Sequence, residues 1–141
     1  NITPDVRATA MSRYMLSEGL VMRALQAEYG VPIKRNVTAG SDDGFDGFFT
    51  FGNSTYVIEV KYFKNLSNRM VERGSLLRLS ASIKDYGWKD AHIIFAQVFE
   101  GSVPAIDSQG LARLINEIET PFSIRRYSLK ELEAQFGIGE A

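Results

Sequence analysis

Three charged side chains, those of Asp46, Glu59 and Lys61, interrupt the most strand-like stretch of the sequence, GFDGFFTFGNSTYVIEVKYFK at residues 44–64. Charges in a sheet cost free energy unless they are paired or bind a metal ion. Carboxylates that share a site repel each other, and a divalent cation relieves the repulsion. Mg²⁺ takes one or two carboxylates together with water and phosphate oxygens, and it makes a bound water more acidic. A neighbouring ammonium can orient that water and offset charge on a phosphate. These residue types therefore indicate metal-assisted hydrolysis of a phosphodiester.

Strand alternation decides whether the three side chains can meet. In a strand predicted at 55–63, Glu59 and Lys61 lie on the same face, with Cα atoms about 6.6 Å apart. A Gly-Asn turn signal separates this strand from another predicted at 45–51, so the two should form a hairpin. Counting outward from the turn places Asp46 near the level of Glu59. We therefore expect two carboxylates and one lysine to converge.

Two alternatives accompany this interpretation. Asp42 or Asp43 would replace Asp46 as the ligand if the strand begins earlier. In the non-catalytic alternative, Glu59 and Lys61 form an ion pair on a solvated sheet face, opposite Asp46, as cross-strand pairs commonly do.

A basic stretch at 61–84 is suited to contacts with phosphates; its cations are Lys61, Lys64, Arg69, Arg73, Arg78 and Lys84. Lys64, Arg69 and Arg73 are the predicted nucleic-acid-binding residues, and the last two share one face of a helix because they are four positions apart. Arg125 and Arg126 are a weaker second candidate for such contacts.

The composition excludes several classes of function. The chain has 141 residues, of which 45% are apolar and 23% charged, and we expect a single domain over 1–141. The net charge of −1 creates no global attraction for nucleic acid, so an anionic partner needs a local patch. The absence of cysteine excludes disulfides, thiolate zinc sites and cysteine nucleophiles. Without an apolar run near ~18 residues or a recognisable signal peptide, we expect a cytoplasmic protein with no membrane partner.

Periodicity and turn signals predict the elements that would position these residues. One helix is predicted at 6–29, with Ser17-Glu18-Gly19 as a point where it could divide. The predicted strands are 31–38, 45–51, 55–63, 91–99 and 122–127. The other predicted helices are 67–86, 107–118 and 128–136. The order α-β-β-β-α-β, followed by α-β-α, indicates an α/β fold with a mixed central sheet flanked by helices.

Asp46, followed after twelve residues by Glu59-Val60-Lys61, is similar to the PD-(D/E)xK nuclease signature. The segments SDDGFDGFF and YVIEVKYFK resemble those of the Mrr-type and resolvase-like branches, and the element order resembles the restriction endonuclease-like core. The resemblance covers roughly 14–100 and leaves the last α-β-α as a C-terminal extension. Phe45 stands where the family usually has proline.

The resemblance implies a metal-dependent endonuclease that hydrolyses phosphodiester bonds in DNA. It implies that Asp46 and Glu59 bind Mg²⁺, with Mn²⁺ as a substitute, that Lys61 acts on the water and the phosphate, and that Glu18 completes the catalytic set. The alternatives are a catalytically silent module of this fold that binds nucleic acid or a protein partner, and a structural domain with a surface ion pair. Cutting both strands of DNA needs two sites, from a homodimer or a larger multidomain protein.

Overall fold

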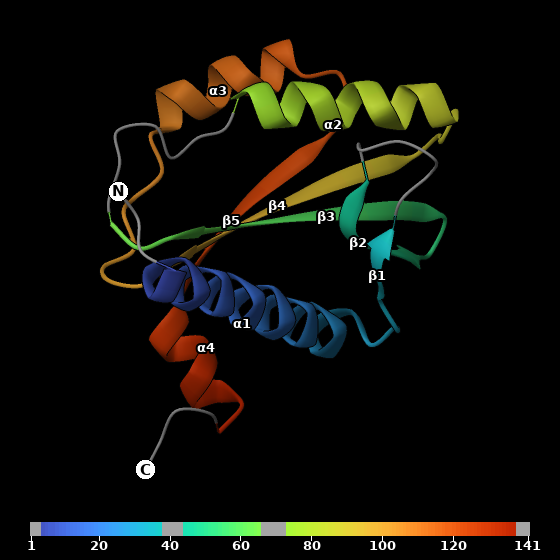
Figure 1. Ribbon diagram of the computed structural model, residues 1–141. Coiled ribbons are helices and arrows are strands. Elements are labelled where there is room, and N and C mark those ends of the chain that lie inside the picture. The colour runs from blue at the N-terminus through green and yellow to red at the C-terminus, as the bar shows by residue number, and fades with distance from the viewer. Residues whose placement is uncertain (1–3, 38–43, 66–72, 138–141) are drawn as a thin grey trace.

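The computed structural model describes residues 4–37, 44–65 and 73–137. Within these residues, five strands form one mixed sheet in the order β1-β2-β3-β4-β5, and four helices cover its two faces (Figure 1). This arrangement confirms the predicted α/β class and the mixed sheet flanked by helices.

The sheet is antiparallel on one side and parallel on the other. Strands β1 (Lys34–Val37), β2 (Phe45–Phe51) and β3 (Ser54–Phe63) pair antiparallel, and the turn between β2 and β3 is the predicted one. Strands β4 (Ala91–Phe99) and β5 (Phe122–Ser128) continue the sheet parallel to β3. Parallel neighbours need a crossover, and here each crossover contains a helix.

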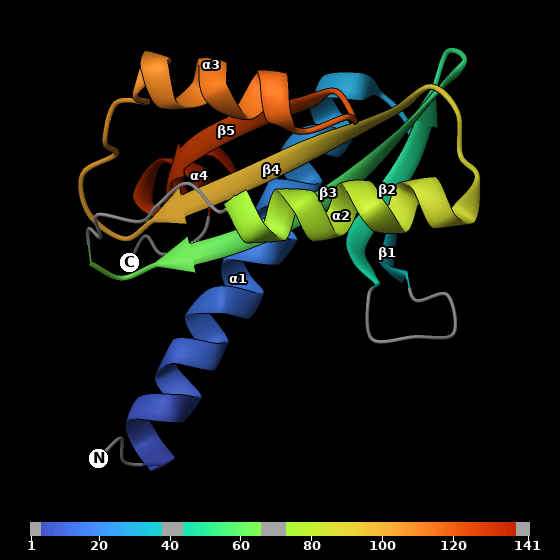
Figure 2. The same ribbon diagram turned by 90° about the horizontal axis from the view of Figure 1, so that it is seen from above.

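Each face of the sheet carries two of the described helices. Helices α1 (Pro4–Tyr29) and α4 (Leu129–Gln135) lie on one face, and α2 (Arg73–Tyr86) and α3 (Ser108–Glu117) lie on the other (Figure 1). Figure 2 shows that the N-terminal half of α1 extends beyond the sheet. None of the helices in the described ranges combines the length and the apolar character that a membrane span needs.

Several element boundaries differ from those expected. Helix α1 does not divide at residues 17–19; the Ser17 hydroxyl donates to the Arg13 carbonyl at 2.8 Å, which a helix accommodates. Strand β1 begins at Lys34 rather than at 31, since Pro32 has no N–H for a ladder bond. The expected start of the second helix at 67 lies outside the described residues, which place α2 from Arg73 onward.

The two faces of β3 bury different apolar clusters, as strand alternation predicts. Ile58 and Val60 join a cluster with Leu20 and Leu25 of α1. Val57 points the other way, into a cluster with residues of α2, α3 and β4. Each fully buried aliphatic side chain contributes about 1.5–3 kcal/mol, so these clusters hold the helices on the sheet. Strand β3 is therefore fixed from both sides.

Gly47 allows α1, β1 and β2 to approach closely near the start of β2. A Cβ atom at this position would lie 3.0 Å from the Lys34 carbonyl oxygen and 3.0 Å from Cε of Met22. Real Cβ atoms rarely have such short contacts, so a larger residue would push these elements apart. The glycine thus lets β2 pack closely against β1 and α1 next to Asp46.

Candidate active site between two diverging strands

Asp46 lies where β2 and β3 separate. The register between these strands ends with Gly47 opposite Ile58, so its next step sets Asp46 opposite Glu59, as counting from the turn predicted. Figure 2 shows the two strands diverging from their hairpin. The backbone N–H of Val60 donates to Oδ2 of Asp46 at 2.7 Å, because a buried N–H needs an acceptor where no strand partner supplies one. The main chain of β3 therefore holds the Asp46 carboxylate in the gap.

Glu59 is buried and has cations on two sides. Its side chain points to the α2 face of the sheet, and the residue is only 7% exposed. Oε2 of Glu59 lies 3.7 Å from Nζ of Lys61 and 3.3 Å from a terminal nitrogen of Arg78 on α2. The predicted position of Glu59 and Lys61 on one face is thus confirmed. Arg78 of α2, which covers this face, is a second cationic partner of Glu59.

The electrostatics of the site disfavour two ionised carboxylates. The pKa of Glu59 is raised to about 7, first by burial and then by the negative charge of Asp46, while Lys61 and Arg78 oppose the shift. Burial also raises the pKa of Asp46, against the lowering effect of the Val60 N–H. The nearby cations therefore do not fully compensate the negative charge.

Helix α1 brings Tyr14 and Glu18 to the other side of Asp46. The Tyr14 hydroxyl lies 3.1 Å from Oε2 of Glu18 and 3.4 Å from Oδ1 of Asp46, and it donates to these oxygens. Burial, reinforced by the charges of Asp46 and Glu18, raises the pKa of Tyr14 far above its usual value, so the hydroxyl keeps its proton. Oε1 of Glu18 accepts from Arg35 at 2.9 Å. Glu18 therefore reaches the site through a tyrosine, and its own carboxylate is paired with an arginine.

Of the predicted nucleic-acid-binding residues, Arg73 is engaged away from this site. The guanidinium of Arg73 is exposed and bonds to Glu117 of α3. Lys64 is exposed just beyond the end of β3. Three further residues singled out from the sequence lie outside the described part of the chain, namely Asp42, Asp43 and Arg69.

Two residues of the site, Tyr14 and Arg35, were missed from the sequence, and the contact of a third, Arg78, was not predicted. Tyr14 is one helical turn before Glu18, and this spacing of four could have identified it. Arg78 belongs to the basic stretch, but only the packing of α2 on the sheet shows that it faces Glu59. Arg35 has no local signal, because its partner lies 17 positions away on another element.

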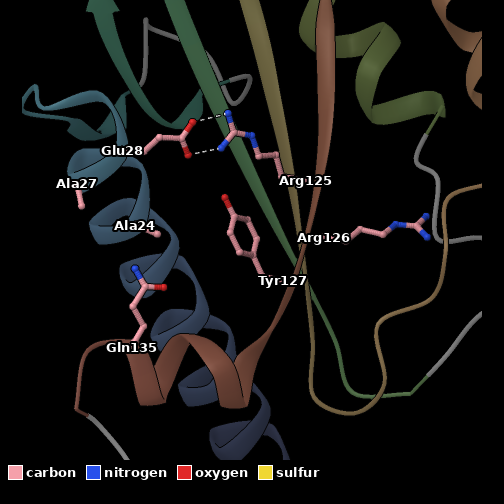
Figure 3. A pocket seen from close by; sticks show the side chains of 7 residues that line it. All are labelled: Ala24, Ala27, Glu28, Arg125, Arg126, Tyr127 and Gln135. Atoms are coloured by element: carbon pink, nitrogen blue, oxygen red, sulfur yellow. Dashed lines mark hydrogen bonds and ion pairs between the residues drawn. The ribbon is translucent and has the colours of Figure 1, made fainter.

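Arg125 and Arg126, the second candidate for phosphate contacts, lie on β5 and point to different sides of it. A hollow of about 480 Å³ between α1, α4 and β5 contains Arg125, whose guanidinium bonds to both carboxylate oxygens of Glu28 (Figure 3). Arg126 points to the opposite side of β5 and bonds to Gln97 and to backbone carbonyls (Figure 3). The two arginines therefore do not form a joint basic patch.

Asp46 and Glu59 are the groups that could hold a metal ion here. In the ranges that the structure describes, no group of three or more His, Cys, Asp or Glu side chains is arranged to bind a metal. Mg²⁺ commonly uses one or two carboxylates and completes its shell with water. The raised pKa values of this pair reflect burial first and then the charge of a neighbouring carboxylate, and a hard dication would stabilise both ionised groups. The donor set therefore fits Mg²⁺ as a two-carboxylate site.

Comparisons with known proteins do not identify a family for this chain. No family model matches the sequence, and no curated protein matches it. Function is therefore inferred from the geometry and the chemistry of the site.

Proposed function

We propose that this protein is a metal-dependent nuclease of the PD-(D/E)xK type, with a restriction endonuclease-like core, that hydrolyses phosphodiester bonds in DNA. The observation that supports the proposal is the convergence of Asp46, Glu59 and Lys61 where β2 and β3 diverge. Both carboxylates have raised pKa values, and shifted carboxylates next to a lysine are typical of catalytic sites.

Asp46 and Glu59 would hold Mg²⁺ or Mn²⁺, which when bound lowers the pKa of water and stabilises charge on a phosphate. The Val60 N–H and the Tyr14 hydroxyl each bond to one oxygen of Asp46, so this carboxylate is positioned before substrate binds.

Lys61 has the reach for a role in the chemistry. Its side chain is 36% exposed, and its ammonium lies 3.7 Å from Glu59. An ammonium has three N–H donors, so Lys61 can interact with Glu59 and also donate to a water or a phosphate oxygen. We expect it to orient the attacking water and to stabilise negative charge as the bond to the leaving oxygen breaks.

A cleavage assay tests the proposal. Supercoiled plasmid and single-stranded DNA are incubated with Mg²⁺ or Mn²⁺ and with wild type, Glu59→Ala, Lys61→Ala or the surface control Lys130→Ala. We expect metal-dependent cutting that falls by at least ~100-fold in the first two variants and is unchanged in the control. Thermal melts show whether each variant is folded.

The same assay separates the alternatives. Binding of DNA without metal-dependent cutting supports a catalytically silent module of this fold. Neither binding nor cutting leaves a structural domain in which Glu59, Lys61 and Arg78 form an ion-pair network. If both strands of a duplex are cut, sedimentation in the presence of DNA would show whether a second copy supplies the second site.

A further inference from the structure

We infer that Arg78, on α2, binds a phosphate of the DNA backbone beside the carboxylates. The inference rests on the proposed nuclease function and identifies the contact that holds the substrate on the α2 face of the sheet.

The guanidinium of Arg78 is held only loosely by the residues that the structure describes. Within the described residues it makes one hydrogen bond, to Oε2 of Glu59, and at 3.3 Å this bond is long for a charged pair. Arg13, by contrast, makes a two-pronged contact with Glu100 at 2.8 and 3.1 Å. A guanidinium has five N–H donors, so most donors of Arg78 have no partner among the described residues and can bond to a ligand.

Arg78 also lies at the right place for a substrate phosphate. Its side chain is 39% exposed, and it approaches the same oxygen of Glu59 as Lys61 does, but from α2 rather than β3. Two partly exposed cations on different elements thus border one buried carboxylate. An anion that lies against Glu59 would meet both cations at once.

The chemistry of a guanidinium favours a phosphate. Its planar fork donates two parallel N–H bonds to phosphate oxygens, which a lysine ammonium cannot do. Arg73 on the same helix has its guanidinium engaged by Glu117, so it is less suited to this contact. Arg78 is therefore the arginine of α2 that faces both the site and the solvent.

DNA binding measured without cleavage tests the inference. A fluorescent duplex of about two helical turns is titrated with protein in Ca²⁺ and again in EDTA, at salt concentrations from about 50 to 200 mM. The proteins are wild type, Arg78→Ala, Arg78→Lys and Arg113→Ala. The control removes the same charge from an exposed position on the neighbouring α3. A parallel titration with inorganic phosphate as competitor separates a backbone contact from binding of free phosphate.

We expect Arg78→Ala to weaken binding by at least ~5-fold and to reduce the slope of log K against log salt by about 0.9, the value for one lost phosphate contact. Arg78→Lys should keep the slope, because the charge remains, and should still bind more weakly than wild type. Arg113→Ala should match wild type in both quantities. In Mg²⁺, Arg78→Ala should cut with a raised KM.

The results distinguish this inference from the proposed function. Equal slopes and affinities for Arg78→Ala and Arg113→Ala overturn the inference even if the wild type cuts DNA, and so does displacement of DNA by inorganic phosphate at low millimolar concentration. If Glu59→Ala cuts DNA as well as wild type does, the nuclease proposal is overturned even if Arg78 binds DNA. If melts show that Arg78→Ala is unfolded, the lysine variant decides, because wild-type affinity in that variant contradicts a two-pronged phosphate contact.

Discussion

At about pH 8 and without divalent cations, we expect Glu59→Gln to be more stable than wild type. The pKa of Glu59 is raised from 4.5 to about 7 in the folded protein, chiefly by burial and then by the charge of Asp46. A raised carboxyl pKa means that the folded state favours the protonated form. The protonated Glu59 carboxyl contributes fully to stability below pH 4.5, and this contribution is lost as the pH rises through about 7. Glutamine has the shape of glutamate and does not ionise, so Glu59→Gln removes the free-energy cost of burying an ionised carboxylate at alkaline pH.

The shift sets the size of the effect. The difference between the folded and the ordinary pKa corresponds to about 3 kcal/mol in the free energy of unfolding, at about 1.4 kcal/mol per pKa unit. The burial of Glu59, which is 7% exposed, means that solvent does little to reduce this value. For a chain of 141 residues, about 1 kcal/mol changes Tm by roughly 3 °C. The variant should thus melt ~10 °C higher than wild type at about pH 8, and at nearly the same temperature below pH 4.5.

Thermal melts in EDTA at several pH values measure this difference. Glu117→Gln is the matched control, because Glu117 is exposed and its bond to Arg73 lowers its pKa. A lowered pKa means that the ionised form stabilises the folded protein, so Glu117→Gln should gain no stability at alkaline pH. The reasoning is refuted if Glu59→Gln is no more stable than wild type at about pH 8, or if its gain does not change with pH.

Three further substitutions test the surroundings of the site. Gly47→Ala should destabilise the protein by about 1–3 kcal/mol in urea unfolding, because the new Cβ has no space; an unchanged midpoint would contradict the close packing. Tyr14→Phe should cost about 1 kcal/mol and lower kcat several-fold, since Asp46 loses a donor, whereas Tyr56→Phe should leave kcat unchanged. Glu100→Gln should speed hydrogen exchange in the N-terminal half of α1, because Glu100 accepts two hydrogen bonds from Arg13 in this part of the helix. Unchanged exchange would show that packing alone holds the helix.

The sheet and the central part of the site follow from local patterns in the sequence. Alternation in β3 correctly placed Glu59 and Lys61 on one face, and the turn signal at Gly52 placed Asp46 at the level of Glu59. These inferences succeed because the period of a strand and the length of a tight turn fix the register. The strand predicted at 91–99 is confirmed as β4, whose apolar residues are buried on both faces of the sheet.

The contacts made between elements could not be predicted in the same way. Arg78 faces Glu59, and Arg73 bonds to Glu117, because of how α2 packs against the sheet and against α3. The basic stretch in the sequence does not show which side of α2 faces the sheet and which side faces α3. Glu18 was expected at the site, but its pairing with Arg35 depends on the crossing of α1 over the β1–β2 edge.

The most direct test of the central claim is diffraction from crystals soaked with Mn²⁺, recorded for anomalous signal from wild type and from Glu59→Ala. We predict one peak in the wild type about 2.1 Å from an oxygen of Asp46 and from an oxygen of Glu59, with no peak in the variant. Absence of the peak, or a peak elsewhere while Glu59 stays bonded to Lys61 and Arg78, would contradict a metal-dependent nuclease site at this position.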